Sequence, residues 1–428
     1  MSESVSKSTV KTRRVFYIPG YDPIHPRRYR ELYRKEGAAQ AQISGYEISL
    51  AAKQGGDRYG WQVNGQIDGA QVAAEFEVLV WSDIVRDSMA TSIPATYLQM
   101  ARTAWTYIAS GALRRLMWLR KGPVIAALYP VGMLILQLLL ALLIGHWAGL
   151  GLSKLVALIP AGTEGLWSTI KSLLSTGLYW GIAAIVFVTL MRWFKKQDGK
   201  FFAYYLMHDY AYSAASNGAN PPELETRLAE FGDVIADALN TGVDEVLIVG
   251  HSSGAHLGVT ILADLIRAGR VPVHGPELSF LTLGQVVPMV SFLPKADRLR
   301  GDLAYLCTRD ELAWVDVTAP GDGCAFALCD PVAVSGVAPA DKQWPLVFSA
   351  AFTQTLSPAR WKELRWRFFR LHFQYLCAFD RPRDYDYFQI TAGPKTLWDR
   401  YQDRNPSNSR IDIAASKYTS VTHGYAPK

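Results

Sequence analysis

A serine lies between two glycines in residues 246–258, which read VLIVGHSSGAHLG. The run from Gly250 to Gly254, GHSSG, fits the pattern G-x-S-x-G and joins an apolar, β-branched run to an apolar, helix-like run. A sharp turn between a strand and a helix holds such a serine in a strained conformation, and side chains at the two glycine positions would collide with neighbouring backbone. The start of the helix would also place partial positive charge near a developing oxyanion. The pattern therefore predicts that Ser252 is a nucleophile. The alternative is a structural serine in a glycine-rich turn.

This stretch resembles the nucleophile elbow of the α/β-hydrolase superfamily, most of all its lipase and esterase members. The resemblance covers the soluble parts of the chain on both sides of an uncharged middle region. It implies a serine hydrolase in which an acid and then a histidine follow Ser252 along the chain. It also implies cleavage of an acyl ester through an acyl-enzyme, for which neither a metal nor an organic cofactor is needed.

The acid is expected in ELAWVDVTAPGDGCAFALCDPV, residues 311–332. Many lipase-like hydrolases carry a tryptophan strand followed by a loop that holds the acid, and this stretch resembles them at Trp314, Asp316, Pro320 and Asp322. The resemblance favours Asp322 as the acid. The alternatives are Asp316 inside the strand, Asp330 further along, and a plain surface turn at Asp322.

Two histidines are candidates for the base. His372 ends the aromatic-rich stretch FFRLH, and its H-x-x-Y form resembles the loop that presents the catalytic histidine in related lipases. His423 lies in a polar terminal segment, where an imidazole is harder to hold within hydrogen-bond reach of a serine. We therefore favour His372, with a histidine on a helix surface as the structural alternative.

An oxyanion hole combines the amide after the nucleophile with an amide from a loop after an early strand. Ser253 supplies the first amide, and FYIPGYDP offers Gly20 and Tyr21 for the second. Here the chain departs from the family, because that loop follows the first strand. The hairpin expected in residues 46–66 comes after it instead of before it.

Residues 122–153 and 172–191, in the middle of the chain, carry no Asp, Glu, Lys or Arg. We expect them to form membrane spans at about 123–148 and 172–194, since roughly 20 apolar residues cross a bilayer core. Their alternative is a pair of buried core helices, which are seldom uncharged over such lengths. Basic residues crowd the outer flanks, at 114–121 and 192–200, so the positive-inside rule predicts a hairpin with both termini cytoplasmic.

Strand-like and helix-like runs alternate in the remaining sequence, which predicts an α/β fold with a mainly parallel sheet flanked by helices. The expected strands lie at 13–18, 46–52, 59–65, 75–81, 243–250, 278–284 and 312–318, and the expected helices at 221–242 and 255–269. The stretch LRWRFFRLH is read either as a strand or as part of one long helix over 357–376. The predicted organisation is a flexible tail (1–14), two parts of one α/β-hydrolase domain (15–113 and 200–402), an inserted transmembrane hairpin (114–199) and a polar, poorly ordered tail (403–428).

The net charge and the cysteine spacing of the chain limit the partners and compartments that are expected for it. A net charge of +6 is modest for 428 residues, and the basic clusters flank the apolar spans, which favours a lipid bilayer over nucleic acid as the partner. The four cysteines show no zinc-type spacing and form no disulfide framework, as expected in a reducing compartment. The sequence therefore predicts an esterase- or lipase-like hydrolase at the cytoplasmic membrane that acts on a lipid or membrane-partitioned acyl ester. The rival is a catalytically inactive, hydrolase-like membrane scaffold or lipid-binding protein.

Overall fold

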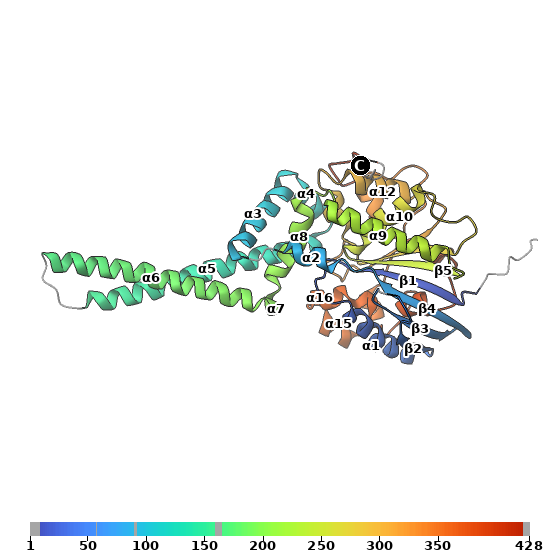
Figure 1. Ribbon diagram of the computed structural model, residues 1–428, viewed down its shortest axis with the longest axis horizontal. Helices are drawn as coiled ribbons and strands as arrows, with labels where there is room; N and C mark the ends of the chain where they lie inside the picture. The colour runs from blue at the N-terminus through green and yellow to red at the C-terminus, as the bar shows by residue number, and fades with distance from the viewer. Residues whose placement is uncertain (1–8, 57, 90–91, 159–164, 423–428) are drawn as a thin grey trace, which may run out of the picture. The chain divides into compact units, whose positions relative to one another are not determined.

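The computed structural model describes residues 9–56, 58–89, 92–158 and 165–422 (Figure 1). These described residues divide into two compact units. The first unit draws on Met1–Ser88, Trp105–Ile125 and Ser213–Lys428, and the second on Met89–Ala104 and Ala126–Tyr212. The chain therefore leaves the first unit and returns to it, as expected for an insertion.

The first unit is built on a sheet with the strand order β2-β3-β4-β1-β5-β6-β7-β8. Within the described residues β3 is antiparallel to both its neighbours, and every other adjacent pair is parallel. The expected α/β architecture with a mainly parallel sheet is confirmed. The strands are β1 (Thr12–Ile18), β2 (Glu47–Ala52), β3 (Gly60–Ile67), β4 (Ala70–Val78), β5 (Glu245–His251), β6 (Glu277–Leu283), β7 (Ala313–Thr318) and β8 (Leu346–Ser349).

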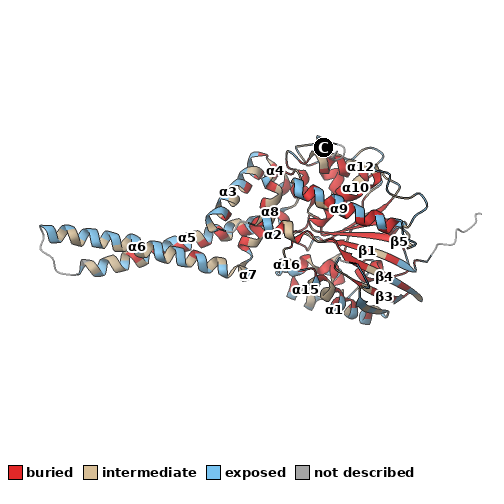
Figure 2. Cartoon of the chain, in the orientation of Figure 1, coloured by how far each residue is buried: buried red, intermediate tan, exposed pale blue. Residues whose placement is uncertain are grey.

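Helices cover both faces of this sheet (Figure 1). One face carries α9 (Pro222–Leu239), α10 (Gly254–Arg267) and α12 (Asp297–Leu306). The other carries α1 (Arg27–Ser44), α15 (Pro358–Leu364), α16 (Phe368–His372) and α17 (Tyr387–Ala392). Because helices lie on both sides, the central strands are buried on both faces: every residue of β5 and of β7 is buried (Figure 2). The shorter elements are α2 (Ser82–Ser88), α4 (Ala112–Leu119), α11 (Val287–Ser291), α13 (Pro331–Val334), α14 (Phe352–Thr355), the 3-10 helix η1 (Gln374–Leu376) and α18 (Leu397–Tyr401).

The region before His372 differs from both sequence expectations. It is neither a strand nor one long helix, but two short helices, α15 and α16, followed by η1. Leu364 and Leu371 are buried, whereas residues 365–368 between them are exposed. A single straight helix or strand would not bury both leucines and expose this whole run, so the chain breaks between them.

The polar C-terminal segment is held to the first unit as far as Thr422, contrary to the expectation of poor order. Ile411 pairs with Cys329 in an isolated parallel bridge, and the Ala415 amide donates to the carbonyl oxygen of Val334 at 3.0 Å. The Thr422 amide donates to the carbonyl oxygen of Asp297 at 3.0 Å. Backbone hydrogen bonds account for this order, and the pattern of hydrophobic residues does not predict them.

The second unit contains two helices that are long and apolar enough to cross a membrane, α5 (Lys121–Ala157, which begins in the first unit) and α6 (Leu166–Lys196). Only 22% of the most apolar window of α5, and none of that of α6, is buried within the protein (Figure 2). A buried pair of core helices would show the opposite, so this exposure favours the membrane-span interpretation. Two glycines of α5 allow the two helices to lie close together. A Cβ atom added to Gly145 would lie 2.8 Å from the carbonyl oxygen of Ala183, and one added to Gly149 would lie 2.5 Å from the carbonyl oxygen of Tyr179.

The second unit is larger than the predicted hairpin. It also includes most of α3 (Ile93–Ala109) and α8 (Ala203–Ala215), with α7 (Asp198–Phe201) between α6 and α8. Leu134 of α5 and Met207 of α8 belong to one buried apolar cluster, against which Tyr97 of α3 packs. α3 and α8 therefore make apolar contacts with α5.

Candidate active site

The predicted nucleophile lies on a tight turn between β5 and α10. Ser252 has a φ of 56°, in the left-handed region that side chains other than glycine seldom adopt. Its amide donates to the carbonyl oxygen of Leu283 at the end of β6, at 2.9 Å. Such a conformation costs on the order of 1–3 kcal/mol and persists only where the surrounding structure imposes it.

The neighbouring glycines are required by close contacts. A Cβ atom on Gly250 would lie 2.8 Å from the Cα atom of Ala255, and one on Gly254 would lie 2.0 Å from the carbonyl oxygen of Ile18. Gly258, one turn into α10, approaches the ring of Phe280 so closely that a Cβ atom would lie at 2.6 Å. The G-x-S-x-G spacing therefore serves backbone packing around Ser252.

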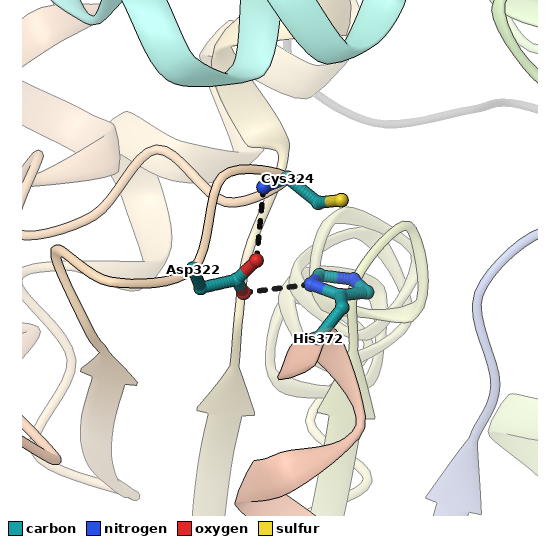
Figure 3. A group of neighbouring side chains, drawn as sticks. All are labelled: Asp322, Cys324 and His372. Carbon is teal, nitrogen blue, oxygen red and sulfur yellow. Dashed lines mark hydrogen bonds and ion pairs between the residues drawn. The ribbon is translucent and has the colours of Figure 1, made fainter. Parts of the chain in front are cut away.

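The predicted acid and base lie in direct contact (Figure 3). His372 Nδ1 is 2.7 Å from Asp322 Oδ2, although the two residues are 50 positions apart. Tyr375 donates its hydroxyl hydrogen to the same carboxylate oxygen at 3.0 Å, and the Cys324 amide donates to Asp322 Oδ1 at 2.9 Å. Both oxygens of the buried carboxylate are thus satisfied, which fixes its orientation.

The surroundings of Asp322 favour its charged form. Burial alone would raise the pKa of this carboxyl, but the His372 ring and the hydrogen bonds from His372, Cys324 and Tyr375 outweigh burial and lower the pKa below its ordinary value. Because Nδ1 of His372 faces a carboxylate, Nε2 is the ring nitrogen left to exchange a proton with another group.

His372 and Ser252 each approach the carboxyl end of β6. A Cβ atom on Gly284, the residue after β6, would lie 3.1 Å from His372 Cε1. The residue before it, Leu283, accepts the Ser252 amide hydrogen. Among the described residues no hydrogen bond joins Ser252 Oγ to the His372 ring. Ligands of parallel α/β sheets bind at this edge, beyond the carboxyl ends of the strands.

The loop after β1 also reaches the nucleophile. A Cβ atom on Gly20 would lie 3.0 Å from Ser252 Cβ and 3.3 Å from Ser252 Oγ. In the sheet β1 lies between β4 and β5, so this loop borders the turn at Ser252 even though its strand comes first in the chain. Tyr21 follows, with its hydroxyl 2.6 Å from Ser88 Oγ in α2, and the buried Ser253 precedes α10.

His251 contacts His372, an interaction that the sequence did not reveal. Its Nε2 lies 3.0 Å from the carbonyl oxygen of His372, and the two ring centroids are 4.8 Å apart. Burial, and secondarily the positive charge that His372 can carry, lower the pKa of His251 to about 3. A histidine that stays neutral can donate to a carbonyl without adding a charge beside His372.

Arg28 links the loop after β1 to the segment that carries His372. Its Nη1 is 3.0 Å from Asp22 Oδ2, and its guanidinium lies over the ring of Phe373, 4.8 Å from the centroid. The contact with Phe373 has no local sequence signature, because it joins α1 to a residue near the far end of the chain.

The alternative residues lie elsewhere. Asp316 is buried in β7, where Thr282 donates to its Oδ1 at 2.6 Å, and Asp330 caps α13 by accepting two backbone amides. Within the described part of the chain neither carboxylate bonds to a histidine. His256 is buried in α10, and burial lowers its pKa to about 4. His423 falls outside the described residues.

One group of side chains in this site has the composition of a metal-binding site. The donor atoms of Asp322, Cys324 and His372 all lie within 4.8 Å of one another (Figure 3). Thiolate, imidazole and carboxylate together suit Zn²⁺. However, His372 Nδ1 and Asp322 Oδ2 are already joined to each other, so a cation ligated by these two atoms would replace that hydrogen bond.

Comparisons of this chain with models of protein families, with curated proteins and with solved structures found no match. The hydrolase interpretation therefore rests on the residues and contacts described above.

Proposed function

We propose that this chain is a membrane-anchored serine hydrolase that cleaves an acyl ester with Ser252, Asp322 and His372. The observation that carries the proposal is the His372–Asp322 pair, with its 2.7 Å separation, at the sheet edge where Ser252 stands in a strained turn. In this proposal the three residues, from distant parts of the chain, follow the chain order of a hydrolase triad, and the bond between His372 and Asp322 supports it.

In the proposed reaction Ser252 Oγ attacks the acyl carbonyl while His372 Nε2 takes its proton. Asp322 remains ionised, holds the ring through Nδ1 and stabilises the imidazolium. The hydrogen bond from Ser252 to His372 would form when substrate is bound, as catalytic hydrogen bonds often do. His372 then returns the proton to the leaving alcohol, and water releases the acid from the acyl-enzyme.

In this proposal two backbone amides near Ser252 hold the oxyanion that forms when Ser252 attacks the carbonyl. Ser253 provides the amide next to the nucleophile, at the start of α10, where the helix dipole adds positive potential. The loop of Gly20 and Tyr21 provides the second amide in this proposal. The contact of Gly20 with Ser252 supports that assignment despite the unusual chain order.

The two apolar helices support a lipid or other membrane-partitioned ester as the substrate. A chain that spans the membrane keeps its hydrolase domain near the bilayer, which benefits a substrate dissolved there. The basic flanks at 114–121 and 192–200 support a cytoplasmic-membrane protein with both termini and the hydrolase domain on the cytoplasmic side.

The test is hydrolysis by the full-length protein reconstituted in vesicles, with a short-chain nitrophenyl ester and a fluorogenic phospholipid as substrates. We expect both to be cleaved, and kcat to fall about 10³-fold or more in Ser252→Ala and His372→Gln. His274→Gln, at an exposed position outside the site, is the matched control and should retain wild-type activity. A folded wild-type protein that cleaves neither ester would favour the inactive scaffold instead.

A further inference from the structure

The segment just before His372 is both strongly basic and aromatic. Residues 360–370 read RWKELRWRFFR, with five cationic side chains, one anionic side chain and four aromatic rings. Trp366 is 70% exposed and Phe368 is 47% exposed. Large aromatic side chains are expensive to leave in water, yet Trp366 and Phe368 alternate with arginines at the surface instead of joining the core.

The positive charge of this segment is only partly compensated. Glu363 lies 2.8 Å from Arg360, 3.6 Å from Arg367 and 3.1 Å from Arg370, so one carboxylate serves three guanidinium groups. Lys362 and Arg365 have no carboxylate within 4.0 Å in the part of the chain that the structure describes. The segment therefore presents a net positive, aromatic surface.

This surface adjoins the loop that carries Asp322. A Cβ atom on Gly323 would lie 3.3 Å from the ring of Phe368, and one on Gly321 would lie 2.7 Å from the ring of Trp361. The same loop contacts the first turn of α5, since a Cβ atom on Gly122 would lie 3.5 Å from the carbonyl oxygen of Gly323. The basic segment, the acid loop and the start of the first apolar helix are thus neighbours within one unit.

We propose that residues 360–370 bind a bilayer surface rich in anionic phospholipid, with Trp366 and Phe368 among the headgroups. Exposed arginines attract anionic headgroups, and aromatic rings favour the interface between headgroups and acyl chains. The apolar helices tether the segment to the bilayer, so even a weak contact forms at high effective concentration. A soluble acidic partner would account for the cations but not for the exposed aromatic rings.

This inference deepens the proposed function, because it names the surface from which the substrate would come. In that respect it rests on the proposed function. If residues 360–370 lie on anionic lipid, the acyl ester enters from that surface, next to the loop of Asp322. The contact itself needs no catalysis, so it can be tested separately from hydrolysis.

The experiment measures the membrane depth of residue 366 in the full-length protein. Cys324 and Cys377, the two thiols that are not fully buried, are replaced by serine, and Trp366→Cys is labelled with an environment-sensitive fluorophore. The protein is reconstituted in vesicles of phosphatidylcholine with or without phosphatidylglycerol, and the acyl chains carry bromine as a quencher. Val273→Cys, at a 93% exposed position, is the matched label control.

We expect the label at residue 366 to be quenched in the anionic vesicles and much less in the neutral ones, and high salt should weaken the quenching. The double variant Lys362→Ala/Arg365→Ala should lower the equilibrium constant for the contact roughly twenty-five-fold, at about five-fold for each cation. The label at residue 273 should be quenched in neither case. Unchanged melting of the double variant would exclude unfolding as the cause.

The absence of quenching in both lipids, or equal quenching in the two, would overturn the inference. A label that responds to a soluble acidic polymer but not to brominated lipid would also overturn it and would assign the segment to a soluble partner. Ser252→Ala should leave the quenching unchanged. An inactive protein that still shows anionic-lipid quenching would therefore count against the proposed hydrolase alone.

Discussion

At the scale of residues, the site depends on neighbours that hold each group in place. Ser252 keeps a positive φ of 56° because the two glycines beside it allow contacts that no side chain would permit. Asp322 keeps its charge in a buried position because three donors face its two oxygens. His251, the residue before Ser252, bonds to the backbone carbonyl of His372.

A second buried carboxyl in the same region should behave in the opposite way. Burial, helped by the charge of Asp330 and opposed by the hydrogen bond from Thr282, raises the pKa of Asp316 to about 8. Between about pH 4 and pH 8 the folded protein keeps this proton, whereas the unfolded chain loses it. Stability attributable to Asp316 therefore falls as the pH rises through this window.

Asp316→Asn should remove this dependence, because the amide cannot ionise and keeps an acceptor for Thr282. Relative to wild type, we expect the variant to gain about 1.4 kcal/mol of stability per pH unit over part of this range. Thermal melting of both proteins in detergent between pH 4 and pH 8 measures the difference. A constant difference across the range would show that Asp316 is ionised in the folded protein.

At the scale of elements, the turn from β5 to α10 depends on backbone contact with the neighbouring strand β1. Gly254→Ala would place a methyl group 2.0 Å from the carbonyl oxygen of Ile18. We expect a loss of about 3 kcal/mol or more in the free energy of unfolding, since neither backbone can move without disturbing the sheet.

Gly232→Ala in α9 is the matched control. A Cβ atom on Gly232 would meet no neighbour within 4 Å, so the substitution should stabilise the helix by about 0.5–1 kcal/mol. Denaturant titrations of both variants measure the two effects. Similar effects of the two substitutions would refute the close approach at Gly254.

The long, strongly patterned elements could be predicted from the sequence, and the short ones could not. The predicted strand at 243–250 corresponds to β5, and the predicted helix at 255–269 to α10. β8 was missed because its four residues, LVFS, are too few to show a period. Residues 358–376 were misread because their apolar side chains are divided between the core and the exposed surface.

The residues of the candidate site could likewise be predicted only in part from the sequence. The G-x-S-x-G spacing pointed to Ser252, and the resemblance to lipases pointed to Asp322 and His372, which the structure brings together. The support from His251 depends on a contact between residues 121 positions apart, for which the sequence holds no local signal.

At the scale of the whole molecule, the two apolar helices predict that parts of the chain lie on opposite sides of a membrane. The basic flanks predict that the connection between α5 and α6 lies on the opposite side from the first unit. Leu158 at the end of α5 and Val273 in the first unit are both strongly exposed, so cysteines at these positions can report the two sides.

In intact cells, a membrane-impermeant maleimide should label Leu158→Cys directly and Val273→Cys only after permeabilisation. The same replacements of Cys324 and Cys377 by serine keep the background low. Labelling of both positions from one side would contradict a transmembrane hairpin, and the reverse pattern would invert the proposed orientation.

The most direct test of the central claim is covalent labelling of the solubilised full-length protein with a fluorophosphonate probe, mapped by mass spectrometry. We predict a single adduct on Ser252, abolished in Ser252→Ala, strongly reduced in His372→Ala and retained in His423→Ala. A wild-type protein that melts cooperatively but acquires no adduct on Ser252 would contradict the proposed serine hydrolase.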